Sequence, residues 1–401
     1  MKKLLLAIAG FGGVLHVACP TFAQNWIPTS APTTNWAAVA SSADGNKLVA
    51  VVANDNQGNP GPIYTSVDAG ATWTQTSAPL MSWTCVASSA NGAKLIAGIG
   101  LGPIHTSVDS GATWTENDAL PFPWTSVASS ADGNKLVATT RTGPIYTLET
   151  SSNPGWTWVE TSAPNIQWRG VASSTDGSRL IAAAVADASG FHPGSVWTSA
   201  DYGVTWQFAS AVPLGPWQCA ASSADGSRLV AMGNGPVYTS ADSGVTWTKA
   251  PAPIRNWTSA ASSSDGTRLV AVAADIKQIF VSTNSGVNWL STGAPGAEWS
   301  SVASSADGSK LVAVAGGAFG GVGRIYIWRP VTARVLSITI SGNTALISWP
   351  TSATGFGLQE NPDLTSTNWA DLTRTPTVTN EQNQVSVSTS EGARFYRLKH
   401  P

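Results

Sequence analysis

The feature of this 401-residue chain that most constrains its fold is an internal repeat of about 40 to 50 residues. Each copy opens on a tryptophan, and the openings fall at Trp36, Trp83, Trp124, Trp168, Trp217, Trp257 and Trp299. Within a copy, short apolar runs with period-two patterning alternate with turns rich in Gly, Asp and Ser, a pattern typical of antiparallel strands. A repeat of this length that is built from strands predicts a β-propeller or a related array.

One copy can be divided into strands from its turn residues. Residues 124–130 form a first expected strand, and the Asp-Gly turn at Asp132 and Gly133 leads to a second over residues 135–139. Residues 145–148 form a third, and a tryptophan-bearing fourth strand follows a further turn. Four short antiparallel strands per copy predict one propeller blade.

The turn before the fourth strand carries a motif, S-x-D-x-G-x-T-W. Clean copies lie at Ser66–Trp73, Ser107–Trp114, Ser199–Trp206 and Ser240–Trp247, and Ser282–Trp289 is a degraded copy. Aspartate can accept hydrogen bonds from turn N–H groups, glycine permits positive φ, and tryptophan can pack beneath. This turn resembles the Asp-box, or BNR, repeat. The resemblance covers about residues 25–328 and implies a propeller of the kind found in sialidases and in some assembly factors.

The N-terminal segment predicts how the propeller closes. Residues 25–32 match residues 72–79, which form the last strand of a blade, whereas the copy that opens at Trp299 runs to Ile327 and lacks that strand. We therefore expect an all-β chain in which residues 24–330 form a seven-bladed propeller of four-stranded blades, closed by the N-terminal strand. Such a join leaves no open sheet edge.

The two ends of the chain do not follow the repeat. Residues 1–23 combine Lys2 and Lys3 with an apolar stretch and small residues before Gln24, a pattern typical of a secretory signal peptide. Residues 331–401 predict a small β-sandwich-like domain, and their sequence resembles a C-terminal β module of secreted bacterial proteins. We expect a secreted or cell-envelope protein.

Composition limits the functional classes. Charged residues make up 11% of the chain and the net charge is −2, which argues against a nucleic-acid partner. No run after the signal peptide is long enough for a transmembrane helix. The four histidines show no metal-ligand spacing, and no phosphate loop or nucleophile elbow occurs, so neither a metal nor another cofactor is expected. Cys85 and Cys219 fall in the same slot of distant blades and are expected to be free thiols in a monomer.

Antiparallel topology sorts the loops onto two faces of the predicted propeller. The Asp-Gly turns and the S-x-D-x-G-x-T-W turns share one face, while the loops that vary in length and chemistry share the other. Variable loops on a rigid scaffold commonly carry function. The opening tryptophans should lie at the inner rim of the variable face, where they either cap the core or bind a ligand. The candidate ligand-binding residues are Trp36, Trp83, Trp124, Trp168, Arg169, Trp217, Trp257 and Trp299.

The sialidase resemblance implies an arginine triad, a Tyr–Glu pair and an acidic Asp. Four arginines are candidates for the variable face, namely Arg141, Arg169, Arg255 and Arg324, and the carboxylates that could be recruited are Asp55, Asp187, Asp275 and Glu298. No pair of carboxylates stands out for glycosidase chemistry. We therefore expect a non-catalytic propeller that binds a glycan or an extracellular or envelope protein. A glycoside hydrolase and a structural or adhesive surface protein remain the alternatives.

Overall fold

The computed structural model describes residues 6–7, 25–54, 57–149, 157–186, 193–316, 322–329, 337–350, 357–362, 368–379, 382–388 and 394–399. All regular secondary structure in these residues is β-strand. Two compact units divide the chain: Asn25–Arg329, and a second unit that joins residues 1–24 to residues 330–401.

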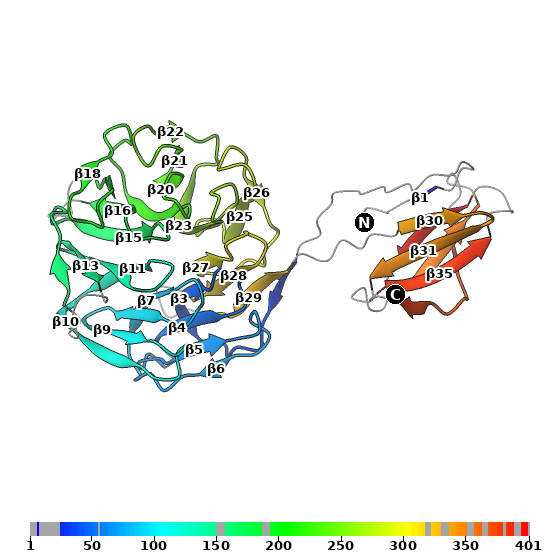
Figure 1. Ribbon diagram of the computed structural model, residues 1–401, viewed down its shortest axis with the longest axis horizontal. Helices are drawn as coiled ribbons and strands as arrows, with labels where there is room; N and C mark the ends of the chain where they lie inside the picture. The colour runs from blue at the N-terminus through cyan, green and yellow to red at the C-terminus, as the bar shows by residue number, and fades with distance from the viewer. Residues whose placement is uncertain are drawn as a thin grey trace. The chain divides into compact units, whose positions relative to one another are not determined.

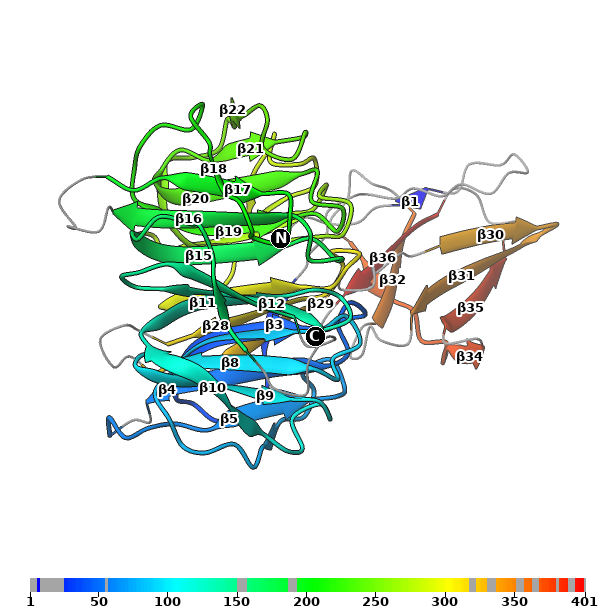
Figure 2. The same cartoon turned by 60° about the vertical axis from the view of Figure 1, so that its left-hand side comes forward.

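The unit Asn25–Arg329 is a β-propeller, in which four-stranded antiparallel sheets follow one another around a central axis (Figure 1). The first sheet consists, from the axis outward, of β3 (Asn35–Ser41), β4 (Leu48–Asn54), β5 (Ile63–Ser66) and β6 (Thr74–Gln75). Figure 2 shows successive sheets stacked face to face.

The later sheets repeat this order. They are formed by β7 (Trp83–Ser88), β8 (Leu95–Ile99), β9 (Gly102–Ser107) and β10 (Thr115–Phe122); β11 (Trp124–Ser129), β12 (Lys135–Thr140), β13 (Ile145–Glu149) and β14 (Val159–Glu160); β15 (Gln167–Ser173), β16 (Leu180–Ala186), β17 (Val196–Ser199) and β18 (Gln207–Phe208); β19 (Trp217–Ser222), β20 (Leu229–Gly235), β21 (Tyr238–Ser240) and β22 (Thr248–Lys249); and β23 (Arg255–Ser262), β24 (Leu269–Ala273), β25 (Gln278–Ser282) and β26 (Leu290–Ser291). A short β20–β23 pairing joins the last two of these sheets.

The N-terminal strand completes the sheet at the other end of the repeat. This sheet contains β27 (Trp299–Ser304), β28 (Leu311–Ala315) and β29 (Ile325–Arg329), and its outermost strand is β2 (Asn25–Pro28). Trp26 lies opposite Trp328, and the Trp26 indole N–H donates to Thr292 Oγ1 of the neighbouring sheet at 2.8 Å. The strand pairing is the one that the repeat predicts, and it covers the edge that β29 would otherwise expose.

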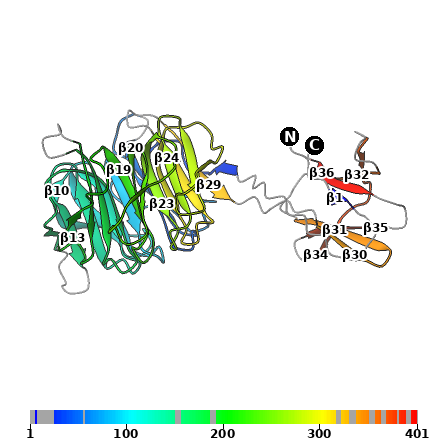
Figure 3. The same cartoon turned by 90° about the horizontal axis from the view of Figure 1, so that it is seen from above.

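Strand direction gives the propeller two faces, which Figure 3 shows edge-on. The turns between the first and second strands and between the third and fourth strands lie on one face, which we call the turn face. The inter-sheet loops and the loops between the second and third strands lie on the other, the loop face. The second strands are apolar on both sides because each lies between two neighbouring sheets. All five residues of β8 and of β24, for example, are buried.

The S-x-D-x-G-x-T-W turns are locked by their own side chains. In the second sheet, Ser107 Oγ donates to Asp109 Oδ1 at 2.8 Å and accepts from the Gly111 N–H at 2.9 Å. The Thr113 N–H and hydroxyl donate to the two oxygens of Asp109 at 2.9 and 2.6 Å. Gly111 has φ +90°, a conformation that glycine adopts without strain. The same bonds recur at Ser199–Trp206 and Ser240–Trp247, as the motif predicts.

Aspartates in both kinds of turn on the turn face predict acid-sensitive stability. Hydroxyl and backbone N–H donors lower the pKa of six carboxyls to about 2, against about 3.9 in an unfolded chain. The six are Asp68, Asp109, Asp176, Asp225, Asp265 and Asp307. A depressed pKa stabilises the folded state above the unfolded pKa, and this stabilisation is lost as pH falls through the folded pKa.

We therefore expect the free energy of unfolding to decline steadily between about pH 5 and about pH 2. Urea unfolding at half-unit pH steps measures this decline. The Asp176→Asn variant lacks one of the carboxyls whose pKa is lowered. Its free energy of unfolding should therefore decline less steeply with falling pH than that of the wild type. A urea midpoint that stays constant from pH 5 to pH 2.5 would show that the turns do not act in this way.

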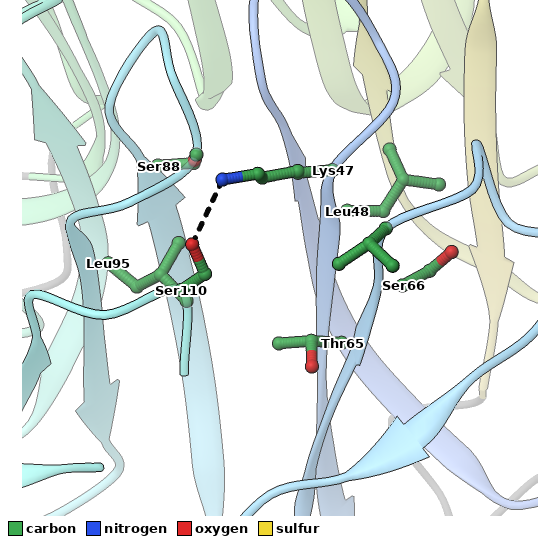
Figure 4. Close-up of a pocket in the computed structure, with 9 residues that line it drawn as sticks. Lys47, Leu48, Thr65, Ser66, Ser88, Leu95 and Ser110 are labelled. Carbon is green, nitrogen blue, oxygen red and sulfur yellow. Dashed lines mark hydrogen bonds between the residues drawn. The ribbon is translucent and has the colours of Figure 1, made fainter. Parts of the chain in front are cut away.

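Basic side chains on the turn face link neighbouring sheets. Lys47 follows the first turn of its sheet, but its stem covers Gly92 of the next sheet, and its ammonium donates to Ser110 Oγ at 3.1 Å (Figure 4). A cavity of about 10 Å³ lies beneath it, about the size of one water molecule. Lys310 closes the ring in the same way, because its stem covers Gly45 of the first sheet.

This arrangement corrects the expected charge pairing within each first turn. An aspartate lies three residues before six of the seven cations that follow the first turns, and this spacing predicts that the charges cancel locally, as for Asp44 and Lys47. Asp44 is instead bonded by the Ser42 hydroxyl and the Asn46 N–H. The cations reach across the seams between sheets, so the basic residues of the turn face hold the propeller together.

The second unit contains two four-stranded antiparallel sheets around one core. One sheet is formed by β30 (Ser337–Ser341), β31 (Thr344–Pro350), β35 (Gln382–Ser388) and β34 (Thr377–Thr379); the other is formed by β1 (Leu6–Ala7), β36 (Phe395–Lys399), β32 (Gly357–Asn361) and β33 (Ala370–Asp371). Trp349 and Tyr396 are the largest side chains buried between the sheets. Apart from Leu6–Ala7, the predicted signal peptide lies outside the described residues.

Candidate functional site

The seven opening tryptophans are buried in the seams between sheets, which favours the first of their two predicted roles, that of capping the core, over ligand binding. Each of the seven has at most 5% of its surface exposed. They are Trp36, Trp83, Trp124, Trp168, Trp217, Trp257 and Trp299. Trp124, for example, packs edge-on against Tyr146 at 5.7 Å between ring centroids. No ring face is open to a sugar or a peptide, so these residues cap the core.

Hydrogen bonding supports the same role for the indole groups. The Trp83 N–H donates to the Gly61 carbonyl at 3.0 Å, and the Trp124 N–H donates to the Gly102 carbonyl at 2.9 Å. Gly61 lies in the loop between the second and third strands of the preceding sheet, and Gly102 is the first residue of the third strand β9. These two indoles therefore tie the connections between the second and third strands of the preceding sheets to the core.

The innermost strands surround a cavity on the propeller axis. Its volume is about 220 Å³, and its lining comes from the three residues that follow each opening tryptophan. It could take one side chain of a ligand, but not a folded segment.

Most hydroxyl groups of the lining bind neighbouring sheets to each other. The Thr84 hydroxyl donates to the Trp124 carbonyl at 2.8 Å, and Ser300 makes the corresponding bond to the Trp36 carbonyl at 2.7 Å. Ser126 Oγ accepts from the Val171 N–H at 3.2 Å. These hydroxyls are committed to the scaffold, so they do not define a ligand site.

Arg169 and Gln218 are the two long polar side chains of the cavity lining, and they come from adjacent sheets. β15 and β19 approach closely beside them, since a Cβ on Gly170 would lie 2.9 Å from Cys219 Cα. Neither side chain makes a hydrogen bond or ion pair within the part of the chain that the structure describes. A guanidinium and an amide thus line the same cavity with their donors free.

A second guanidinium adds positive charge at this end of the cavity. Desolvation, and then the charge of Arg141, lower the pKa of Arg169, although arginine stays protonated in proteins. Arg141 follows β12 on the loop face, is exposed, and likewise makes no ion pair with a described residue. An anion placed between these groups would relieve their repulsion. The site is therefore suited to a carboxylate or another anionic group.

Two ion pairs hold other charged groups of the loop face. Arg255 Nε lies 4.0 Å from Asp275 Oδ2, and Asp275 also accepts from the Asn256 N–H at 3.3 Å. Lys277 pairs with Glu298 at 2.6 Å. Of the carboxylates considered for catalysis, Asp275 and Glu298 are thus paired with cations, while Asp55 and Asp187 lie outside the described residues.

The two cysteines near the axis are free and buried, as predicted. Burial raises the pKa of the Cys85 thiol to about 11 and that of the Cys219 thiol to about 12. A thiol is a poor nucleophile when its thiolate form is so disfavoured. Both act as small residues that let the innermost strands converge.

Of the three residues of the candidate site, Arg169 was predicted as a ligand-binding residue and Arg141 as an arginine of the variable face, while Gln218 was not among the candidate ligand-binding residues. Gln218 occupies the same position as Arg169, directly after an opening tryptophan. Arg141 directly follows the second strand β12, and residues at such positions lie on the same loop face as the starts of the innermost strands. Position in the repeat was therefore the signal that could have identified these residues. The tryptophans, which are more conspicuous in the sequence, belong to the core.

Comparisons with known proteins support the architecture. No protein-family model and no curated protein sequence matches the chain. Among solved structures, hydrazine synthase from Kuenenia stuttgartiensis matches with a TM-score of 0.57 and 14% identity over 75% of this chain and 97% of that chain. The β-propeller domain of Cps50 (Swd1) from Myceliophteria thermophila gives 0.55 and 13% over 77% and 100%. YCF48 bound to a D1 peptide gives 0.56 and 15% over 80% and 99%.

No helix in the described part of the chain is long and apolar enough to cross a membrane. At sequence identities of 13–15%, these structural matches support the fold alone. Residues Asn25–Arg329 of this chain form a β-propeller.

Proposed function

We propose that the chain is a non-catalytic binding protein of the Asp-box type, secreted or held at the cell envelope. Its seven blades, closed by β2, form a rigid ring that binds an anionic segment of a protein partner at the loop-face end of the axial cavity. The observation that carries this proposal is the pair of unpartnered donors, Arg169 and Gln218, on one cavity wall. Arg141 contributes a second positive charge.

A peptide is favoured over a sugar because the tryptophans are buried. An exposed indole face would suit stacking on a sugar ring, and none of these seven tryptophans offers one. A cavity of about 220 Å³ suits one acidic side chain or a chain end of an extended segment. Among proteins of similar fold, YCF48 has been solved with a D1 peptide bound, which supports a peptide ligand for a propeller of this kind.

The test is a peptide array that contains acidic peptides and their amide counterparts, probed with the purified protein. Losing a hydrogen bond to a charged group costs about 1.5–3 kcal/mol. We therefore expect the Arg169→Ala variant to bind the selected acidic peptides about 10- to 100-fold more weakly. The amide counterparts should bind weakly to both proteins.

A matched control is Arg228→Ala, which removes an arginine from the turn face, where its guanidinium donates to Ser285 Oγ at 2.9 Å. This variant should bind as the wild type does. Unchanged binding by Arg169→Ala would contradict the proposed site. Binding confined to a parallel glycan array would replace the peptide with a carbohydrate ligand.

A further inference from the structure

A second pocket lies on the first sheet, away from Arg169. It has a volume of about 330 Å³ and is lined by the inter-sheet loop before β3, by Val52, and by the start of the third strand with Pro62 and Tyr64. Tyr64 is half-buried, and this burial raises the pKa of its hydroxyl. Thr34 forms part of the floor.

The sheet of β11–β14 contains the same local frame. Residues 61–65 and residues 143–147 share the sequence Gly-Pro-Ile-Tyr-Thr. The Trp36–Tyr64 rings meet edge-on at 5.4 Å, and the Trp124–Tyr146 rings meet edge-on at 5.7 Å. The two sheets thus present an almost identical tryptophan–tyrosine pair toward the loop face.

The residue two positions before the opening tryptophan differs between the two sheets. In the β11–β14 sheet it is Phe122, which stacks on Tyr146 at 5.1 Å with an interplanar angle of 27° and meets Trp124 edge-on at 5.8 Å. In the first sheet it is Thr34. Threonine has no ring to place over Tyr64, and the space that phenylalanine would occupy belongs to the pocket.

We propose that this pocket binds an aromatic side chain of a partner polypeptide, stacked on Tyr64 as Phe122 stacks on Tyr146. The chain itself shows the fitting ligand, because Phe122 lies in an extended Pro-Phe-Pro segment, residues 121–123. Aromatic pairs prefer such offset stacking, and the prolines of the wall, Pro32 and Pro62, add apolar surface. This role of the pocket rests on the proposed peptide ligand and would give that ligand a second contact, at Tyr64, on a different sheet from Arg169.

The probes are two uncharged, capped pentapeptides, acetyl-Ala-Pro-Phe-Pro-Ala-amide and its counterpart with alanine in place of phenylalanine. Saturation-transfer NMR titration of the purified full chain gives their dissociation constants. We expect saturable binding of the phenylalanine peptide, at least about tenfold tighter than that of the alanine peptide, since one buried aromatic ring is at stake.

Two variants of the pocket sharpen the test. Thr34→Phe supplies the missing ring from the chain itself and should abolish binding. Phe122→Ala opens the equivalent space over Tyr146 and should add one binding site for the phenylalanine peptide. Should either variant fail to fold in a thermal melt, Tyr64→Ala removes the stacking ring and should also abolish binding.

Arg169→Ala should leave the binding of these uncharged peptides unchanged, so failure of this inference can be told apart from failure of the anion site. Equal affinity for the two peptides would overturn the inference. Unaltered binding by Thr34→Phe would also overturn it. Displacement of the peptide by cellotriose would do the same, because it would show that Tyr64 stacks on a sugar.

Discussion

Replacing Trp124 with alanine is expected to lower the free energy of unfolding by about 3–5 kcal/mol, the usual cost of removing a large buried aromatic side chain. Trp124 is 1% exposed, and its indole N–H donates to the Gly102 carbonyl at 2.9 Å. The variant therefore creates a cavity and leaves the Gly102 carbonyl without its indole donor. Urea unfolding followed by circular dichroism measures the loss.

Leu101→Ala is the control, because Leu101 lies beside this loop and is 73% exposed. Its removal should change the free energy of unfolding by less than about 0.5 kcal/mol. If Trp124→Ala instead kept its stability and lost only ligand binding, the tryptophan would face a ligand and its assignment to the core would be wrong.

Deleting residues 25–28 is expected to produce the other large effect. The deletion removes β2, exposes the edge of β29, and takes Trp26 out of the core, where it is 7% exposed. The loss of one buried tryptophan alone predicts a cost of at least about 3 kcal/mol. The unpaired edge is a template for pairing with other chains, so we also expect aggregation in sedimentation velocity.

Addition of a synthetic peptide with the sequence of residues 24–33 should restore monodispersity, because an extended peptide can add to an open sheet edge. Deletion of residues 1–23 alone is the matched control and should leave the melting temperature of the propeller unchanged. A 25–28 deletion variant that melts like the wild type would show that the propeller does not depend on this strand.

The fold could be predicted because each strand and turn recurs in several copies of the repeat. The turn residues of S-x-D-x-G-x-T-W define the third-to-fourth turn chemically, and their recurrence places every strand between fixed points. The match between residues 25–32 and 72–79 likewise predicted the pairing of β2 with β29. The C-terminal unit has no repeat, and its short strands β33 and β34 were missed for that reason.

The candidate site could be predicted only in part, because composition does not tell a buried ring from an exposed one. A tryptophan at the entrance of an innermost strand can point outward to a ligand or inward to the seam. The deciding factor is three-dimensional: the indole reaches a carbonyl of the preceding sheet, as Trp83 does at Gly61. Arg169 follows Trp168 directly and points to the opposite side of the strand, toward the axis.

The central claim is that Arg169 recognises an anionic group at the mouth of the axial cavity. Isothermal titration of one acidic peptide selected on the array, into the wild type and into Arg169→Lys, tests it most directly. Lysine keeps the charge but loses the planar fork that pairs with a carboxylate. The account predicts about tenfold weaker binding by Arg169→Lys, with a thermal melt like that of the wild type. Equal dissociation constants for the two proteins would contradict it.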